Sequence, residues 1–104
     1  MSDKRLTLRL LTPAGAAAEV SCDGVQLTLR ENAAGRQGGL VGIEPGHTPA
    51  VLALGEGPIL ALTDHREFFR ASASGGFALV KDDAVTVITD SAVIDQAPSG
   101  AGSS

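Results

Sequence analysis

The chain has 104 residues, 43% of them hydrophobic, and a formal net charge of −4. This length is enough for one domain with one core, because domains usually run from about 50 to 250 residues. The negative balance and the scattered basic residues disfavour nucleic acid and anionic lipid as direct partners, since both need clustered Lys and Arg. One cysteine, Cys22, cannot form an internal disulfide; it fits a reducing cytoplasm, and a buried apolar role is its ordinary interpretation.

Strand patterns fill the first part of the chain. Leucines at positions 6, 8 and 10 alternate with other residues, which is the period-two pattern of a strand with one buried face. Turn residues follow at 12–15, then a short strand at 17–21, a turn at Asp23-Gly24 and a strand at 25–30 with a polar face. Residues 31–39 have the composition of a mobile surface loop.

The second part continues in the same way. Apolar content resumes at 40–43, Pro45-Gly46 forces a turn, and residues 50–54 and 59–62 are typical of short strands. Asp64-His65 marks the next turn, and strands are predicted at 67–72, 76–80 and 84–89, with Lys81-Asp-Asp83 as a tight hairpin connection.

These patterns predict an all-β fold. Strand signals recur about every 8 to 12 residues, and no segment shows sustained helical spacing. We expect a flattened sandwich or barrel of two antiparallel sheets, because that closure buries one face of each strand. Residues 1–94 are predicted to form this domain and residues 95–104 a disordered Gly/Ser/Pro tail. No segment has the length and composition of a signal peptide or a membrane helix of about 20 residues, so any membrane association is expected through another protein.

Residues that could carry chemistry are few and lack a recognisable motif. His47 and His65 are too few for a histidine-based metal site. Ser72 and Ser74 are not surrounded by the nucleophile-elbow pattern of a hydrolase, and no glycine-rich segment ends in Lys-Ser or Lys-Thr as a phosphate loop does. We therefore expect no catalytic residue, no metal site, no cofactor and no bound nucleotide.

The most distinctive segment is Gly42-Ile-Glu-Pro-Gly-His-Thr-Pro49. Its two prolines and two glycines indicate a sharply turned, ordered loop, with His47 held between rigid ends and Ile43 available as an anchor. From these residues alone, His47 is either a contact residue or a structural one.

This segment resembles the Gly-x-x-Pro-Gly-His-x-Pro turn of the epsilon subunit of rotary F-type ATP synthases. The resemblance runs from about Leu6 to Ile94 and is carried by four further pieces in the family's order. They are Leu6 to Pro13, Gly55-Glu-Gly-Pro-Ile-Leu60, Gly75-Gly-Phe77 and Val85-Thr-Val-Ile-Thr-Asp-Ser-Ala92.

The resemblance implies a ten-stranded sandwich that is a non-catalytic rotor subunit. In such an enzyme the domain docks on the gamma subunit and rests on the c-subunit ring, at the cytoplasmic face of the bacterial inner membrane, and couples ion translocation to ATP synthesis without binding a small-molecule substrate. By the same resemblance, the turn and the loop before it lie toward the c ring and the foot of gamma, whereas one sheet face packs on gamma. The interface residues implied are Thr12, Leu40, Ile43, Glu44, Pro45, Gly46 and His47.

Two features depart from the family's pattern. Leu40 stands where many relatives have an acidic residue, so an apolar contact is expected in place of a polar one. After Ile94-Asp95 the pattern that leads relatives into two helices is not continued, so we expect the helical arm to be absent, a form compatible with an N-type complex.

Two other functions compete with this interpretation: a stand-alone ligand-binding β-barrel and a small β-rich hydrolase. A binding protein should have an apolar interior pocket, whereas an adaptor should have a filled core and an extended contact face.

Overall fold

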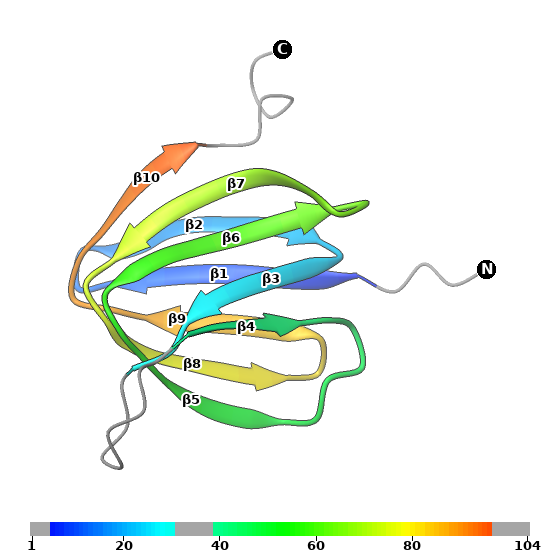
Figure 1. Ribbon diagram of the computed structural model, residues 1–104. Coiled ribbons are helices and arrows are strands. Elements are labelled where there is room, and N and C mark those ends of the chain that lie inside the picture. The colour runs from blue at the N-terminus through cyan, green and yellow to red at the C-terminus, as the bar shows by residue number, and fades with distance from the viewer. Residues whose placement is uncertain (1–4, 31–38, 97–104) are drawn as a thin grey trace.

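Two five-stranded sheets pack face to face in the computed structural model, which describes residues 5–30 and 39–96 (Figure 1). Sheet A has the strand order β2-β1-β9-β8-β5, and sheet B has the order β10-β7-β6-β3-β4. The strands are β1 (Leu6–Thr12), β2 (Gly15–Cys22), β3 (Gly24–Thr28), β4 (Leu40–Ile43), β5 (Ala50–Leu54), β6 (Gly57–Thr63), β7 (Arg66–Ala73), β8 (Gly76–Lys81), β9 (Ala84–Ile88) and β10 (Ala92–Gln96). The expected all-β sandwich is confirmed. The described residues contain no helix long and apolar enough to cross a membrane.

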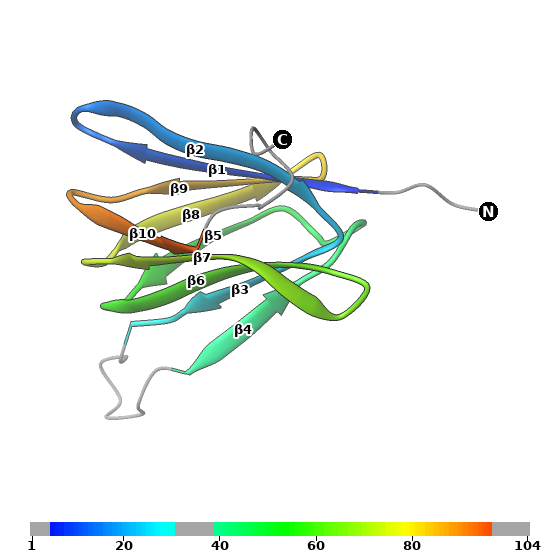
Figure 2. The ribbon, with the colours of Figure 1, turned by 90° about the horizontal axis from the view of Figure 1, so that it is seen from above.

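One strand pairing differs from the expectation of purely antiparallel sheets. β1 and β9 run parallel, with Thr7 opposite Ala84 and Leu11 opposite Ile88, while the other pairings are antiparallel. A parallel pair cannot be joined by a tight turn. Here the two strands are separated by most of the chain, which travels through sheet B and back, as Figure 2 shows.

The tenth strand was not predicted from periodicity. β10 pairs with β7, with Ala92 opposite Ala73, and the Ser72 hydroxyl donates to the Asp95 carboxylate at 2.8 Å. The strand therefore extends through Asp95 and Gln96, the first two residues of the expected tail. Residues 97–104 and most of the predicted loop, 31–38, lie outside the described residues.

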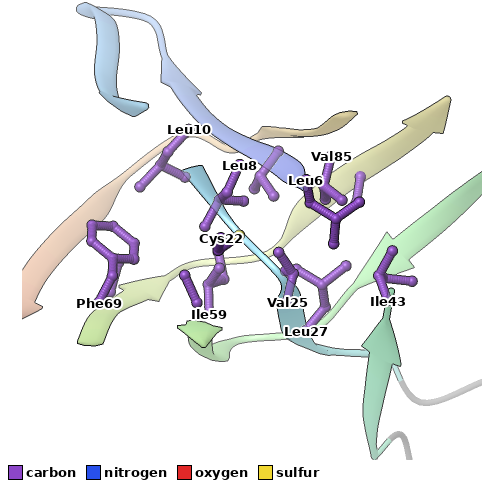
Figure 3. Close-up of a cluster of buried hydrophobic side chains, with 14 of the residues drawn as sticks. Leu6, Leu8, Leu10, Cys22, Val25, Leu27, Ile43, Ile59, Phe69 and Val85 are labelled. Carbon is purple, nitrogen blue, oxygen red and sulfur yellow. The ribbon is translucent and has the colours of Figure 1, made fainter. Parts of the chain in front are cut away.

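The core lies between the sheets and is mainly aliphatic (Figure 3). The alternating leucines of β1, at positions 6, 8 and 10, are at most 1% exposed and meet Phe69 and residues of β3 and β6. Cys22 is also fully buried, and desolvation raises the pKa of its thiol. The role predicted for this cysteine, a small buried side chain, is confirmed.

Left-handed backbone turns close two of the predicted hairpins. Asp64 and His65 have φ values of 55° and 64°, and Asp82 and Asp83 have 52° and 60°. Two consecutive positive φ values define the type I′ turn, whose twist matches that of the flanking strands. Asp tolerates this conformation better than most residues, which explains its use at three of the four positions.

The connections gather at two ends of the sandwich, seen at the right and left of Figure 1. We call the first the histidine end; it holds the 44–49 connection and the 64–65 and 82–83 turns. The second, the glycine end, holds the 13–14 turn and the connections at 55–56, 74–75 and 89–91.

Candidate docking surfaces

The seven residues implied as interface residues fall at both ends of the sandwich. Glu44 to His47 belong to the histidine end, where the Gly46 amide donates to the Asp83 carboxylate. Thr12 ends β1 at the glycine end, and Leu40 pairs with Thr28 near the same end. The seven-residue strand β1 spans roughly 20 Å between these ends. The structure therefore does not bring the seven residues together.

The segment from Glu44 to His47 forms a type II turn. The His47 amide donates to the Glu44 carbonyl at 3.1 Å, and Gly46 has φ +87°. Pro45 supplies the fixed φ of the second position, and the third position needs the positive φ that glycine adopts without strain. The His47 side chain is exposed and its Nδ1 lies 2.7 Å from the Thr48 carbonyl oxygen. The turn thus presents the imidazole on a stiff support.

Three other implied contact residues have distinct environments. Ile43 is 0% exposed and packs in the core, so it anchors the turn and is not available to a partner as a free side chain. The Thr12 hydroxyl accepts from the Ala14 amide at 3.2 Å and donates to the Gly15 carbonyl at 3.4 Å, so it closes the β1–β2 turn. Leu40 is 61% exposed on edge strand β4.

A further surface, whose residues the sequence reasoning did not name, is an apolar patch on the outer face of sheet A. It comprises Val51, Phe77, Leu79 and Ile88, which are 42–66% exposed. Val51 lies opposite Leu79, and Phe77 lies opposite Ile88, so the four side chains are neighbours on β5, β8 and β9. Contiguous exposed apolar side chains on the surface of a domain indicate a contact surface.

The sequence did hold a signal for this patch. A strand that is covered on one face alternates apolar and polar residues, whereas a strand covered on both faces is apolar throughout. Residues 50–54 and 77–80 are uninterrupted apolar runs. Once Leu52, Leu54, Ala78 and Val80 are placed in or against the core, the side chains that alternate with them must point outward, and these include Val51, Phe77 and Leu79.

Ion pairs lie on other parts of the outer surface. On sheet B, Arg70 contacts Glu67 at 2.8 Å, and this hydrogen bond holds the pKa of the Glu67 carboxyl below its ordinary value. On sheet A, away from the patch, Arg9 lies 3.4 Å from Glu19. These exposed pairs add little stability, but they mark surfaces compatible with water.

A hollow of about 710 Å³ adjoins the patch at the glycine end. Phe77 and Ile88 belong to both, and Thr12 and Arg30 also line the hollow. The Arg30 guanidinium stands over the Phe77 ring at 5.9 Å from its centroid, a cation–π arrangement. The apolar patch therefore continues into a concave surface with a cation at its border.

The residues considered for chemistry have ordinary structural positions. The Ser74 hydroxyl lies 3.4 Å from the Thr89 hydroxyl, and the Ser72 hydroxyl is bonded to Asp95. His65 lies in the β6–β7 turn and His47 in the 44–47 turn. Among the residues that the structure describes, no three His, Cys, Asp or Glu side chains are grouped as a metal site would need.

Comparison with known proteins confirms the resemblance seen in the sequence. The family model described as "ATP synthase, Delta/Epsilon chain, beta-sandwich domain" matches residues 5–95. A curated relative, the ATP synthase epsilon chain of Micrococcus luteus, is 39% identical over 59 residues, which are 57% of this chain and 65% of the relative. The chain thus matches slightly less than two thirds of that relative's length.

Two solved structures share the fold. A chain of the Euglena gracilis mitochondrial ATP synthase OSCP/F1/c-ring assembly superposes with a TM-score of 0.69 at 24% identity, over 90% of this chain and 56% of that one. A chain of the Tetrahymena thermophila mitochondrial ATP synthase central stalk and c-ring superposes with a TM-score of 0.63 at 13% identity, over 88% and 68%. The sandwich, the Pro-Gly-His turn and the family match over residues 5–95 together show that this chain belongs to the ATP synthase delta/epsilon family, as its β-sandwich domain.

Proposed function

We propose that this chain is the central-stalk epsilon subunit of an ATP synthase, a non-catalytic adaptor that docks the gamma subunit onto the c-subunit ring. In that role it turns with both and couples ion translocation to ATP synthesis, as a peripheral component at the cytoplasmic face of a bacterial inner membrane. Family membership supports the proposal, as do the relative named an ATP synthase epsilon chain and the fold shared with the central stalk and c-ring assembly.

The observation that carries the proposal is the apolar patch on a domain with a filled core. The buried cluster joins both sheets, and three hollows in the described part of the chain, including the one beside the patch, lie at the surface between strands and connections. A stand-alone ligand-binding barrel would instead enclose an apolar cavity. An adaptor needs a rigid body and a complementary face, because torque passes through packed interfaces.

We assign the gamma subunit to the apolar patch. Val51 and Leu79 lie toward the histidine end, whereas Phe77 and Ile88 lie toward the glycine end. A partner lying along this face would reach both ends of the sandwich. This assignment explains why the implied interface residues lie at opposite ends of the sandwich. A contact at one end alone would leave out the residues at the other.

The glycine end and the histidine end cannot both face the c ring. We propose that the histidine end, with Glu44 to His47, contacts the ring or the foot of gamma, and that Leu40 and Thr12 meet a different part of the assembly. Leu40 offers an apolar side chain that is 61% exposed, so its contact there would be hydrophobic.

We also propose that residues 97–104 do not act as an inhibitory helical arm. The sequence at 97–104 holds Pro98 and two glycines and shows no apolar repeat that could dock a helix. Deleting residues 97–104 should leave assembly and the hydrolysis rate of the complex unchanged, and a several-fold rise in hydrolysis would contradict this part of the proposal.

Co-purification tests the function itself. The full chain, expressed with the gamma and c subunits of the same enzyme, should be recovered with both after affinity capture of gamma. A chain with Leu79→Glu should be lost from the complex while remaining folded, because the charge falls in the patch. Failure of the unsubstituted chain to co-purify with gamma and the ring would overturn the proposed function.

A further inference from the structure

The connection from β4 to β5 crosses from sheet B to sheet A and is exposed along most of its length. Residues 46–49 are all exposed, so the connection has little apolar burial to hold it in place. A connection of this kind is expected to open at low free-energy cost unless specific hydrogen bonds fix it. The question is what keeps the Pro-Gly-His turn in one position.

The turn leaves one backbone donor free for this purpose. Its own hydrogen bond joins the His47 amide to the Glu44 carbonyl and does not use the amide of Gly46. That amide donates to the Asp83 carboxylate at 2.7 Å. Within the described ranges, this is the one hydrogen bond that ties residues 45–47 to an element distant in the chain.

Asp83 is itself firmly placed. It is the second residue of the type I′ turn between β8 and β9, with φ 60°, and its carbonyl accepts from the Thr7 amide at 3.0 Å. Its backbone is therefore held to β1 while its side chain reaches the turn. A short hydrogen bond from an amide to a carboxylate is stronger than one between neutral groups.

We propose that Asp83 is a positioning residue that holds the Pro-Gly-His turn, and with it His47, in the orientation that meets the partner. This inference rests on the proposed function, in which the turn belongs to the contact with the c ring or gamma. By fixing the turn before the partner arrives, the Asp83 carboxylate lowers the entropy lost on binding. Asp83 is not expected to touch the partner itself.

The neighbouring residue provides a matched control. Asp82 has the same charge and nearly the same backbone conformation, φ 52°, but it is exposed and its carboxylate accepts no hydrogen bond from the described part of the chain. Glycine fits a positive φ at both positions, so Asp82→Gly and Asp83→Gly each remove one negative charge without straining the hairpin. Asp83→Asn keeps an acceptor oxygen and also tolerates the left-handed conformation.

Amide hydrogen exchange of Gly46, followed by NMR in the full isolated chain, tests the positioning directly. Exchange should become about tenfold faster in Asp83→Gly, rise less in Asp83→Asn, which keeps an acceptor oxygen but loses the charge, and stay close to the unsubstituted rate in Asp82→Gly. The affinity for a purified complex of gamma and the c ring should fall about three- to tenfold in Asp83→Gly alone among the three variants.

Two results would overturn the inference. Equal Gly46 exchange in Asp83→Gly and Asp82→Gly would show that the carboxylate does not hold the turn. The second result is faster Gly46 exchange in Asp83→Gly together with equal affinity of the two variants for the gamma and c-ring complex. It would show that the position of the turn does not affect binding. Failure of the proposed function would give a different result, because the unsubstituted chain would then not bind the gamma and c-ring complex at all. In that case the turn would have no role in such a contact. The exchange rates would still decide whether Asp83 positions the turn.

Discussion

Replacing Val51 by glutamate places a charge in the apolar patch at the residue that is most exposed there. Val51 is 66% exposed on edge strand β5, opposite Leu79. Full burial of a valine side chain contributes about 1.5–3 kcal/mol, so covering the exposed two thirds contributes about 1–2 kcal/mol. An unpaired carboxylate buried in an apolar contact costs at least another 1–3 kcal/mol.

These terms predict a loss of roughly 3 kcal/mol in the binding free energy of the gamma complex. Since 1.4 kcal/mol corresponds to a factor of ten, the dissociation constant should rise about 100-fold. The assay is titration of the purified chain against gamma by calorimetry or surface-based kinetics. Unfolding by urea should show little change in stability, because a substitution at an exposed position usually shifts it by less than about 0.5 kcal/mol.

Val93→Glu is the matched control. Val93 is 64% exposed and also lies on an edge strand, but β10 belongs to sheet B, away from the patch. The same substitution there should change the affinity for gamma by less than about threefold. If Val51→Glu binds gamma as tightly as the unsubstituted chain, the assignment of gamma to the patch is refuted. If both variants lose affinity for gamma equally, the effect is one of charge and is not specific to this face.

Three further predictions concern single positions. Gly76→Ala should destabilise the domain by several kcal/mol in urea unfolding, because the φ of Gly76 is +115° and a Cβ there would collide with the Ile88 carbonyl. Gly42→Ala is the control and should be nearly neutral, because its Cβ meets nothing within 4 Å. Similar stabilities for the two variants would contradict the close approach of β8 to β9. Cys22 should not react with a thiol reagent in the folded chain, since burial both shields the sulfur and raises its pKa, and should react fully in denaturant; rapid reaction in the native state would show that this part of the core opens. Cysteine at position 47 should cross-link to gamma or to a c-subunit loop in the assembled complex, and cross-links formed exclusively from the glycine end would refute the orientation proposed for the sandwich.

Most of the strands, and the family, could be predicted from local sequence patterns. Period-two alternation in residues 6–11 and 84–89 located β1 and β9, because the spacing of a pleated strand forces one row of side chains into the core. The turns at Asp64-His65 and at Asp82-Asp83 were predictable because few residues tolerate two positive φ values. The Pro-Gly-His segment indicated the family through its resemblance to the family's turn, and the type II geometry explains why Pro45 and Gly46 stand there.

How these elements combine into surfaces depends on contacts between residues that are far apart in the chain. Periodicity says that a strand has two faces but not which strands share one, so the parallel β1–β9 pair and the apolar patch could not be obtained from it. β10 escaped prediction because its exposed apolar residues, Val93 and Ile94, do not follow the alternation of a half-buried strand. The Gly46–Asp83 hydrogen bond joins residues 37 positions apart. Contacts of this kind form when the two sheets pack on each other. They join residues that are far apart in the chain, so the local sequence around each residue does not indicate its partner.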